Sequence, residues 1–333
     1  MQKRRIAVVG ATGMVGRMFL KVLEERGIEA DYELFASERS AGSTLPFFGI
    51  DHVVSELKED SFVGKGFQYA LFSAGGTISA KFAPLAAASG AIVIDNSSQW
   101  RMDQDVPLVV PEVNPEALHS IPKGIVANPN CSTIQAVVPL KVLDDAFHIR
   151  RIVYSTYQAV SGAGQKGYQD LEDGLCGALP KKFPHPIAGN CIPHIDVFLE
   201  NGNTKEEQKM IDETRKILSR PDLRVSATCV RVPVYHGHSE SINVEFDRPF
   251  ELSEVYRLLE HAEGIVVRDD PKNNVYPMPI EAAGTDPVYV GRIRRDTSIE
   301  NGLNFWCVAD NIRKGAALNA VQIMEHLIKG ENK

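Results

Sequence analysis

The sequence lacks any apolar run that approaches the roughly 18–20 residues that a membrane-spanning helix needs. It also lacks an excess of basic residues: 36 Lys and Arg stand against 43 Asp and Glu, which gives a formal net charge of −7. The basic start MQKRR leads directly toward a glycine loop, with no apolar signal core. These absences argue against a membrane protein, a secreted protein and a nucleic-acid-binding protein, which would carry a basic face.

Cysteines are few, and their number does not fit a disulfide framework. The five are Cys131, Cys176, Cys191, Cys229 and Cys307, an odd and widely scattered set. Hydrophobic residues make up 44% of the chain and charged residues 24%, as in ordinary globular proteins. We therefore expect a folded protein in a reducing, cytoplasmic environment.

The first 130 residues alternate between strand-like and helix-like segments. Mostly apolar runs at 5–9, 32–36, 69–73, 91–95, 108–111 and 124–127 are expected to be strands buried on both faces. Helical periodicity covers residues 14–26 and 78–89. Strands that alternate with helices predict an α/β domain with a doubly wound parallel sheet of the Rossmann type.

From residue 131 the pattern changes to α+β. We expect helices at 132–147 and 204–219 and strands at 151–160, 223–235, 240–246, 288–295 and 304–309. Pro139 predicts a kink or an early end of the first of these helices. A length of 333 residues fits two domains. We place them at 1–130 and 131–310, the second with a mixed sheet, and expect a last helix at 311–329 to return to the first domain.

Short polar segments follow the strands of the first domain. They read GATGMVG, ASERS, SAGG, DNSS, PEVN and PNCS. All fall at the carboxyl ends of strands, which is the edge where open α/β sheets bind ligands. Because polar residues are common in such loops anyway, this pattern taken alone leaves a purely structural explanation open.

Residues 10–16 form a glycine loop that follows a strand, opens a helix and has the spacing G-x-x-G-x-x-G. Glycine lets the backbone turn tightly and approach a pyrophosphate, which the free N–H groups and the dipole of a helix N-terminus attract. The loop is a variant of the dinucleotide-binding fingerprint in the structural context that the fingerprint requires. We predict a bound dinucleotide here; the alternative is a tight turn without a ligand.

Residues 37–40 indicate which dinucleotide binds. An NAD site typically places a lone acidic residue at the end of the second strand. Here Ser37, Arg39 and Ser40 suit a 2′-phosphate, and Arg39 also offers a planar face for the adenine. Glu38 remains an alternative ligand for an NAD ribose. The balance favours NADP.

Cys131 is the candidate nucleophile. It lies in NPNCST between a predicted strand and a predicted helix, where the helix dipole and free N–H groups stabilise a thiolate. The thiolate is the reactive form of cysteine, and beside a nicotinamide it suggests an acyl thioester that is formed and reduced. The alternative is an inert, buried cysteine.

Together these motifs resemble the aspartate-semialdehyde dehydrogenase family. The resemblance rests on GATGMVG, SERS, DNSSQWR, PEVN, NPNCST, YQAVSGAG and a late R-x6-H pair, and it runs from residue 6 to about 325. It implies that NADPH reduces L-aspartyl-4-phosphate to L-aspartate semialdehyde and phosphate, on the route to lysine, methionine and threonine. It also implies a homodimer.

The resemblance implies roles for individual residues. Cys131 matches the acyl-thioester nucleophile and Gln158 a residue that orients the substrate, while Arg101 and Asn130 match phosphate- and substrate-binding positions. The implied cofactor-contacting residues are Gly10, Thr12, Gly13, Met14, Val15, Ser37, Arg39, Ser40, Ser73, Gly75, Ser161, Gly162 and Asn311. The simpler alternatives are a glutamine satisfied by backbone at 158 and a solvated loop charge at 101.

Arg231 and His238 form the late pair. An arginine among alternating apolar residues is costly to bury without an anion, and Arg231 matches the arginine that clamps the substrate α-carboxylate. His238 matches the acid/base histidine, and an ordinary histidine pKa of about 6.5 suits proton transfer. His236 competes with it if the strand continues. No metal site is expected, since the two histidines have no evident third ligand nearby.

Glu207 and Lys209 resemble the family's pair for the substrate amino group and phosphate. Thr204-x-x-Glu207 is also a capping box, which explains the glutamate without a substrate. A lysine at position 209 has the alternative of facing solvent from the helix. Both interpretations remain open at the level of the sequence.

Two other functions compete with this interpretation. An N-acetyl-γ-glutamyl-phosphate reductase shares the glycine loop and the cysteine chemistry, but Glu207 with Arg231 favours a substrate with a free α-amine and α-carboxylate. A non-catalytic dinucleotide-binding regulator would not need Cys131, Gln158 and His238 together.

Overall fold

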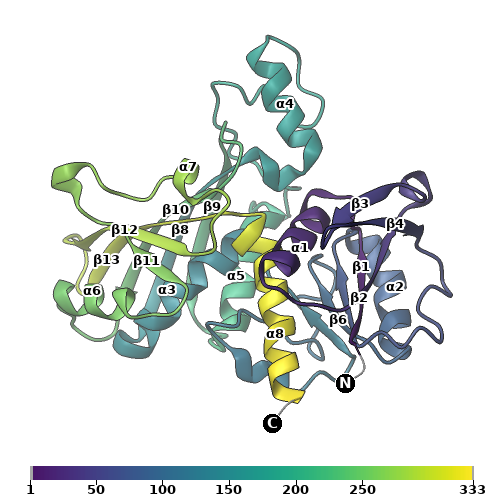
Figure 1. Cartoon of the computed structure of the whole chain (residues 1–333). Helices are drawn as coiled ribbons and strands as arrows, with labels where there is room; N and C mark the ends of the chain where they lie inside the picture. Colours follow the sequence, from purple (N-terminus) through teal and green to yellow (C-terminus); the bar gives the residue numbers. More distant parts are fainter. Residues whose placement is uncertain (1–2, 332–333) are drawn as a thin grey trace. The chain divides into compact units, whose positions relative to one another are not determined.

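The computed structural model describes residues 3–331 and consists of two compact units (Figure 1). Unit 1 contains the chain up to Pro129 and from Ala316 onward, and unit 2 runs from Asn130 to Gly315. The chain therefore enters unit 2 immediately before Cys131 and returns to unit 1 after Gly315. The boundaries expected at residues 130 and 310 lie close to these positions.

Unit 1 is built around a seven-stranded sheet with the order β3-β4-β2-β1-β5-β6-β7. Its strands are β1 (Arg5–Val9), β2 (Asp31–Ala36), β3 (Thr44–Phe47), β4 (Ile50–Glu56), β5 (Tyr69–Phe72), β6 (Ile92–Asp95) and β7 (Ile125–Ala127). All neighbouring strands are parallel except β3 and β4. The strand order reverses beside β1, which is the position where such sheets bind ligands. The predicted Rossmann-type sheet is confirmed.

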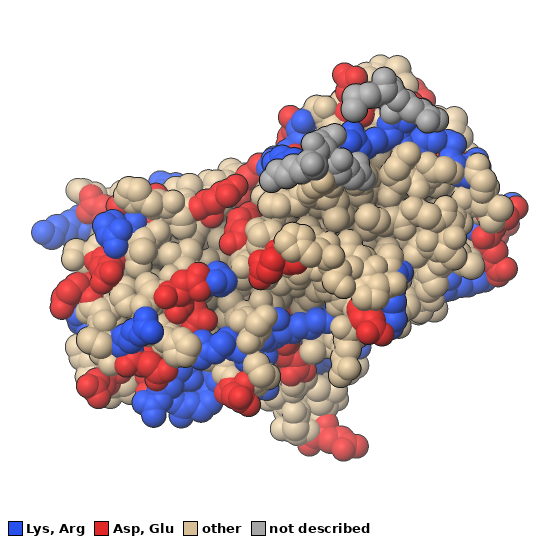
Figure 2. All heavy atoms as spheres, turned by 90° about the horizontal axis from the view of Figure 1, so that it is seen from below, with Lys and Arg blue, Asp and Glu red and all other residues tan. Residues whose placement is uncertain are grey.

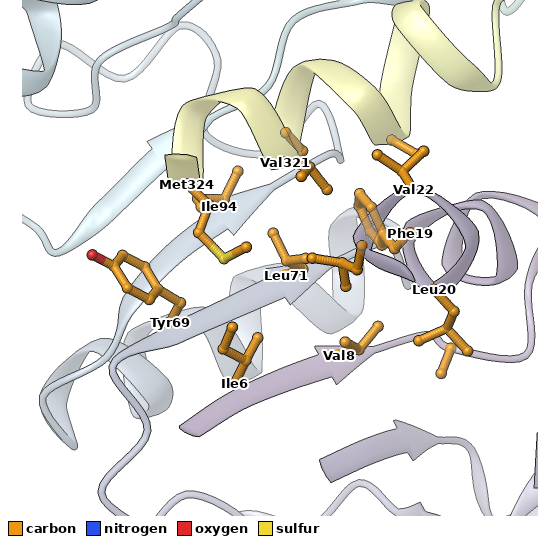
Figure 3. Close-up of a cluster of buried hydrophobic side chains, with 14 of the residues drawn as sticks. Ile6, Val8, Phe19, Leu20, Val22, Tyr69, Leu71, Ile94, Val321 and Met324 are labelled. Atoms are coloured by element: carbon orange, nitrogen blue, oxygen red, sulfur yellow. The ribbon is translucent and has the colours of Figure 1, made fainter. Parts of the chain in front are cut away.

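Helices cover this sheet and bury its apolar side chains. They are α1 (Met14–Glu25), α2 (Gly76–Ala88) and α8 (Asn319–Glu331), and short 3₁₀ turns are η1 (Glu38–Ser40) and η2 (Pro115–His119). Figure 3 shows α1 and α8 over one face, where Phe19 and Val321 lie above Ile6, Val8 and Leu71 of the strands. α2 packs against β5, β6 and β7. Every residue of β5 is buried, as expected for a parallel strand covered on both faces.

Two segments of unit 1 differ from the expectations drawn from the sequence. Residues 108–111 form no strand, and Leu108 makes only an isolated bridge to Ala127. β3 and β4 have no counterpart among the expected strands, and they pair as an antiparallel hairpin. Pro46 lies within β3, which tolerates a proline because it is an edge strand.

Unit 2 contains a mixed six-stranded sheet with the order β11-β12-β13-β10-β8-β9. Its strands are β8 (Ile149–Gln158), β9 (Arg224–Arg231), β10 (His238–Phe246), β11 (Ile265–Val267), β12 (Val288–Asp296) and β13 (Gly302–Ala309). β10 is antiparallel to both β8 and β13, whereas β9 runs parallel to β8 at one edge. The mixed sheet expected for the second domain is confirmed.

One face of this second sheet is covered by helices α3 (Cys131–Phe147), α5 (Lys205–Ile217) and α6 (Leu252–Glu260) (Figure 1). Alternate residues of β10 point to that face, so Ile242 and Val244 are fully buried. On the opposite face, Tyr157 is 39% exposed. The connections contain η3 (Val160–Ala163), α4 (Gln165–Leu175), η4 (Pro271–Asn273) and α7 (Pro279–Ala282).

Pro139 does not end α3, contrary to the expectation. The helix is continuous from Cys131 to Phe147, and Pro139 belongs to a stretch in which every residue is buried. The packing of that buried stretch offsets the hydrogen bond that the proline removes. The sequence pattern shows the lost bond but not the packing.

Several boundaries in unit 2 also differ. β9 ends at Arg231 instead of residue 235, with Pro233 shortly after it, and β10 begins at His238 instead of residue 240. Helices α4 and α6 were absent from the expectations. The segment expected as one helix at 311–329 is a π-helical turn, η5 (Arg313–Leu318), followed by α8. Short π-helical segments frequently occur at functional sites.

Figure 2 shows one face of the molecule, on which Lys and Arg side chains are interspersed with Asp and Glu. Within residues 3–331, no helix has the length and apolar character that crossing a membrane requires. The same residues contain no group of three His, Cys, Asp or Glu side chains placed to hold a metal ion.

Candidate active site

Cys131 is the first residue of α3, and Asn130 caps that helix. The side-chain oxygen of Asn130 accepts hydrogen bonds from the N–H groups of Ser132 and Thr133 at 3.0 and 3.3 Å. α3 is 17 residues long, and its dipole places a positive partial charge at its N-terminus. A thiol at this position is biased toward the thiolate form.

Three polar side chains lie in one row of the sheet of unit 2. The strand register places Gln158 of β8 opposite Arg231 of β9. It also pairs Tyr157 of β8 with Ser239 of β10, so the next position along brings Gln158 beside His238. Gln158, Arg231 and His238 are 1%, 4% and 0% exposed, on the face that the helices cover. Three strand ends thus bring together residues that are far apart in the sequence.

Arg231 is a buried cation with few partners. One terminal nitrogen donates to the carbonyl of Ala159 at 2.6 Å, and Nε has no hydrogen-bond partner among the described residues. Burial lowers the pKa of Arg231, although the negative charges of Glu206 and the Cys131 thiolate act in the opposite direction. A guanidinium in this state is stabilised by an anion that enters the site, and its planar fork suits a carboxylate.

His238 is held as a neutral hydrogen-bond donor. The N–H group of Ala159 donates to Nδ1 at 3.0 Å, so we assign the proton of the neutral ring to Nε2. Nε2 has no partner among the described residues. Burial and the nearby charge of Arg231 lower the pKa of His238 to about 3. The ring therefore presents an N–H group to the site, which differs from the ordinary pKa that the sequence suggested.

Glu206 is a buried carboxylate that was not among the residues expected at the site. Its Oε1 accepts hydrogen bonds from the amides of Asn130 and Gln158 at 2.8 and 3.1 Å, and its Oε2 accepts one from Lys209 at 3.1 Å. Burial alone would raise the pKa of Glu206, but Lys209 and the two amides lower it to about 2. Glu206 is therefore ionised at neutral pH, and it links the cap of α3 to the central row of the sheet.

Glu207 closes the cap of α5 and does not reach this network. Its Oε2 accepts the N–H of Thr204 at 2.7 Å, and the Thr204 hydroxyl accepts the N–H of Glu207, which completes a capping box. Its Oε1 accepts the N–H of Cys229 at 3.0 Å. Because backbone groups occupy both oxygens, we correct the substrate-binding role expected for Glu207. Helical spacing instead puts Glu206, three residues before Lys209, on the same face as that lysine.

Lys209 belongs to the network and does not face solvent freely. Its Nζ donates to Asp196 at 2.9 Å and to Glu206 at 3.1 Å, and its side chain is 19% exposed. Burial would lower the pKa of Lys209, but the two carboxylates raise it overall. The lysine is therefore charged and helps to keep Glu206 ionised.

His236 does not share a strand face with His238. The chain leaves β9 at Arg231, and His236 lies before β10, with its ring centroid 5.7 Å from that of Tyr168. The competition between the two histidines is therefore resolved by the strand boundary, since only His238 belongs to the row of buried polar side chains.

Two glycines leave room for the reactive side chains. A Cβ atom at Gly162 would lie 2.8 Å from Nη1 of Arg231 and 3.2 Å from Nε2 of His238. A Cβ atom at Gly315 would lie 2.9 Å from Cβ of Cys131. Neither glycine has a positive φ. Space around the site, and not backbone conformation, therefore excludes a side chain at both positions.

Ser161 and Asn311 connect the loop after β8 to the start of β10. Nδ2 of Asn311 donates to the Ser161 hydroxyl at 3.1 Å, and Oδ1 of Asn311 accepts the N–H of Gly237 at 2.9 Å. Both side chains are buried. The contacts with a cofactor expected for Ser161, Gly162 and Asn311 stay predictions.

In unit 1, the loop between β1 and α1 has a backbone that requires glycine. Gly10 has φ 84°, and a Cβ atom there would lie 2.3 Å from the carbonyl oxygen of Ser73. A Cβ atom at Gly16 would lie 2.1 Å from the carbonyl oxygen of Gly10. Gly13 is the N-cap of α1, and Gly75 is the N-cap of α2; neither helix start has a side-chain cap. These uncapped helix starts fit a pyrophosphate, because their N–H groups need an acceptor.

The turn after β2 carries the residues expected to distinguish NADP from NAD. Ser37 precedes η1, which comprises Glu38, Arg39 and Ser40. Ser37, Glu38 and Arg39 are exposed to solvent. Arg39, which is expected to bind a 2′-phosphate, and Glu38, the alternative ligand for an NAD ribose, are thus both accessible to solvent.

Arg101 is fixed by backbone groups of unit 1. It is 8% exposed, and its guanidinium donates to the carbonyls of Asn128 and Asn96, each at 3.0 Å. A solvated loop charge would not be held in this way. The guanidinium therefore has a defined position, as a phosphate-binding group requires.

Comparisons with known proteins agree with this arrangement. Residues 5–121 match the family "Semialdehyde dehydrogenase, NAD binding domain" and residues 140–314 match "Semialdehyde dehydrogenase, dimerisation domain". The chain is 58% identical over 335 residues to the aspartate-semialdehyde dehydrogenase of Aquifex aeolicus, with 98% of each chain covered. The chain belongs to the aspartate-semialdehyde dehydrogenase family.

Solved structures of aspartate-semialdehyde dehydrogenases share the whole fold. Aspartate semialdehyde dehydrogenase II of Vibrio cholerae, complexed with ASA, is 48% identical and superposes with a TM-score of 0.95 over 99% of both chains. The Candida albicans enzyme with NADP is 27% identical, with a TM-score of 0.77 over 98% of both chains. Family membership thus makes this chain an oxidoreductase with a nicotinamide-dinucleotide-binding domain.

The resemblance to the aspartate-semialdehyde dehydrogenase family that the sequence motifs indicated is therefore confirmed. Of the predicted residues in unit 2, the structure gathers Gln158, Arg231 and His238 on one face of the sheet. It adds Glu206 to them. The sequence did contain a signal for Glu206. Glu206 and Lys209 are three residues apart on one helix and therefore share a face, whereas Glu207 and Lys209 are two residues apart and do not.

Proposed function

We propose that this chain catalyses the NADPH-dependent conversion of L-aspartyl-4-phosphate to L-aspartate 4-semialdehyde and phosphate, through a thioester on Cys131. One observation carries the proposal: a buried arginine short of partners and an ionised glutamate lie in the network around the nucleophile helix. These are the opposite charges that the α-carboxylate and α-ammonium groups of an amino acid need. The names of the relatives support the same substrate class.

Cys131 makes and breaks the covalent bond in the proposed reaction. The thiolate attacks the acyl-phosphate carbon, phosphate leaves with the bonding electron pair, and a thioester remains. Bound NADPH supplies the hydride that reduces this thioester. The Nε2–H group of His238 donates to the substrate oxygen while negative charge develops on it. Cleavage of the C–S bond then releases the aldehyde and restores the thiolate.

The substrate's charged groups have proposed partners among the described residues. Arg231 binds the α-carboxylate, Glu206 binds the α-ammonium group, and Gln158 orients the acyl group between them. Asn130 positions Glu206, and we assign the phosphate to Arg101, whose guanidinium is already fixed. An N-acetylated substrate brings no ammonium group, so it would gain no ion pair with Glu206. Glu206 and Arg231 together therefore favour the aspartyl substrate over an N-acetyl-glutamyl one.

We propose NADP as the cofactor, in preference to NAD. Arg39 supplies positive charge for a 2′-phosphate, and the hydroxyls of Ser37 and Ser40 add hydrogen bonds. The neighbour from Candida albicans contains NADP, which supports the same choice. Further proposed cofactor contacts in the glycine loop and the two strand ends are Gly10, Thr12, Gly13, Met14, Val15, Ser73 and Gly75.

We also propose a cytoplasmic homodimer that associates through the open face of the sheet of unit 2. That face carries Tyr157 and Trp306, with ring centroids 5.4 Å apart, beside a cavity of about 350 Å³ that includes Met278. The matching family description names a dimerisation domain. All five cysteines are free, which suits a reducing compartment. Light scattering would give twice the chain mass of 36.6 kDa for a dimer.

A coupled absorbance assay tests the proposed function. The purified protein receives aspartate semialdehyde, inorganic phosphate and either NADP or NAD. We expect sustained NADPH formation only when phosphate is present, with NADP as the better cofactor. Without phosphate, each Cys131 yields at most one NADPH as the thioester forms. Activity only on N-acetyl-glutamate semialdehyde would refute the substrate and our assignment of Arg231 and Glu206. Binding of NADP without any turnover would favour a dinucleotide-binding regulator.

The pH dependence of turnover tests the state of His238. Because the pKa of the folded state is lowered to about 3, the ring takes up a proton only when the pH falls through that value. We therefore expect no loss of kcat from His238 between about pH 5 and 8. His238→Asn should lower kcat by on the order of 100-fold at every pH in this range. An acid limb near pH 6.5 that disappears in this variant would contradict the assignment.

Glu206 and Glu207 provide a matched pair of variants. Glu206→Gln removes the charge that the substrate ammonium needs, and we expect KM for aspartate semialdehyde to rise by on the order of 100-fold, equivalent to about 2–3 kcal/mol. Glu207→Gln keeps a capping box, since glutamine also serves at that position, and should leave KM unchanged. Steady-state kinetics of both variants give the comparison. A larger effect at Glu207 than at Glu206 would reverse our correction.

A further inference from the structure

Glu240 is a fully buried carboxyl group that the proposed reaction does not use. It lies on β10 two residues after His238 and on the same face of the sheet, and it is 0% exposed. Neither of its carboxyl oxygens has a hydrogen-bond partner among the described residues within the distance limits of a normal bond. A buried carboxylate without partners is strongly destabilising, so this group needs a physical explanation.

The surroundings of Glu240 do not favour a negative charge. The strand register places Cys307 of β13 directly opposite it, and Cys229 lies one strand further on the other side. Tyr154 and Glu206 are its other titratable neighbours. None of these groups carries a positive charge. Burial raises the pKa of Glu240 well above its ordinary value. The contact with Gln135 acts in the opposite direction, and the charge of Glu206 raises the pKa by less.

Thr156 lies opposite Glu240 on β8, but its hydroxyl donates to Oε1 of Gln158 at 3.0 Å. The other polar side chain that faces Glu240 is that of Gln135. It lies on α3 four residues after Cys131, which places it one turn further along the same side of the nucleophile helix. Its Nε2 donates to the backbone carbonyl of His238 at 3.2 Å, and its Oε1 has no partner among the described residues. The amide oxygen of Gln135 and both carboxyl oxygens of Glu240 thus lack partners among the described residues. A single proton on the carboxyl group satisfies both side chains, because the acid then donates to the amide oxygen.

We propose that Glu240 is a positioning residue: as a neutral carboxylic acid it donates to Oε1 of Gln135, and Gln135 holds the carbonyl of His238. This chain of contacts fixes the position of His238 relative to the helix that begins with Cys131. The inference rests on the proposed function, because the position of His238 matters for catalysis only if His238 acts on the substrate. It assigns Glu240 no contact with the substrate.

Variants at both ends of the proposed contact test it. Glu240→Leu removes the donor, and we expect kcat to fall by on the order of 100-fold, the cost of misplacing a reacting group by about 1 Å, while KM stays unchanged. Glu240→Gln keeps a neutral donor and should restore most of the lost kcat. Gln135→Leu should lose as much as Glu240→Leu, and the double variant should lose no more than either. Glu245→Gln, on the opposite face of the same strand, is the control and should behave as the unmodified chain.

Infrared difference spectroscopy gives a readout that does not depend on activity. The unmodified protein at neutral pH should show the C=O stretch of a protonated carboxylic acid that is absent from Glu240→Gln. Absence of this band, or a loss in Glu240→Gln equal to that in Glu240→Leu, would overturn the proposal. If Glu240→Leu does not fold, the infrared comparison and Gln135→Leu still decide. A protein without activity on aspartate semialdehyde would refute the proposed function, but the infrared result would stand separately.

Discussion

Replacement of Cys131 by serine is expected to lower kcat by at least on the order of 10⁴-fold. The helix dipole and the charge of Arg231 favour a thiolate at the start of α3, but a serine hydroxyl is far too weak an acid to ionise there. The variant keeps the size of the side chain, so the cap and the packing on Gly315 should be retained. Removing the covalent nucleophile typically abolishes most of the rate enhancement of such enzymes.

Mass spectrometry makes this prediction specific. The unmodified protein, mixed with aspartate semialdehyde and NADP without phosphate, should gain the mass of an aspartyl group on the peptide that contains Cys131. Cys131→Ser should gain none. Cys176→Ser, an exposed cysteine in the same unit, is the matched control and should keep full turnover. A Cys131→Ser protein that retains turnover would remove the thioester from the mechanism.

Replacement of Arg231 is expected to have the second largest effect. Arg231→Lys keeps the charge but loses the planar fork, so we expect KM for aspartate semialdehyde to rise by on the order of 30–100-fold. Arg231→Met removes the charge as well and should raise KM by on the order of 1,000-fold, within the 2–5 kcal/mol typical of a buried charged contact. Steady-state kinetics with increasing aldehyde concentration measure both values.

Arg231→Met should at the same time leave the protein as stable as before or more stable. The arginine is buried and short of partners, and burial lowers its pKa. An apolar side chain of similar volume would therefore remove the free-energy cost of burying this charge. Thermal unfolding of the free protein checks this. A variant that binds substrate poorly because it unfolds would show a lower melting temperature, which would contradict our explanation.

The fold was largely predictable from local patterns. Apolar runs that alternate with helical periodicity led to the parallel sheet of unit 1, and the glycine spacing after β1 fits the close approach of Gly16 to Gly10. The hairpin of β3 and β4 was not predictable in this way, because its short strands include Pro46 and are half exposed. Pro139 gave a misleading signal, since burial of α3 is a tertiary property.

The site was predictable where the reactivity or charge of a side chain is enough to identify it. Cys131, Arg231 and His238 have reactive or charged side chains in unusual surroundings, so the sequence pointed to them. The sequence pointed to Glu207 and not to Glu206, because which of two neighbouring residues turns inward depends on the rotation of the helix about its axis. The capping box accounts for Glu207, and only the structure shows which neighbour turns inward. The lowered pKa of His238 depends on burial and on Arg231, which no local pattern reveals.

The space at Gly162 and Gly315 has a consequence for how this chain tolerates mutation. Neither position has a positive φ, so an alanine at either meets no backbone strain. It would instead push a methyl group against Arg231 and His238, or against Cys131. The geometry of the site therefore constrains two residues that have no reactive group. A variant library screened for turnover would therefore reject alanine at both positions.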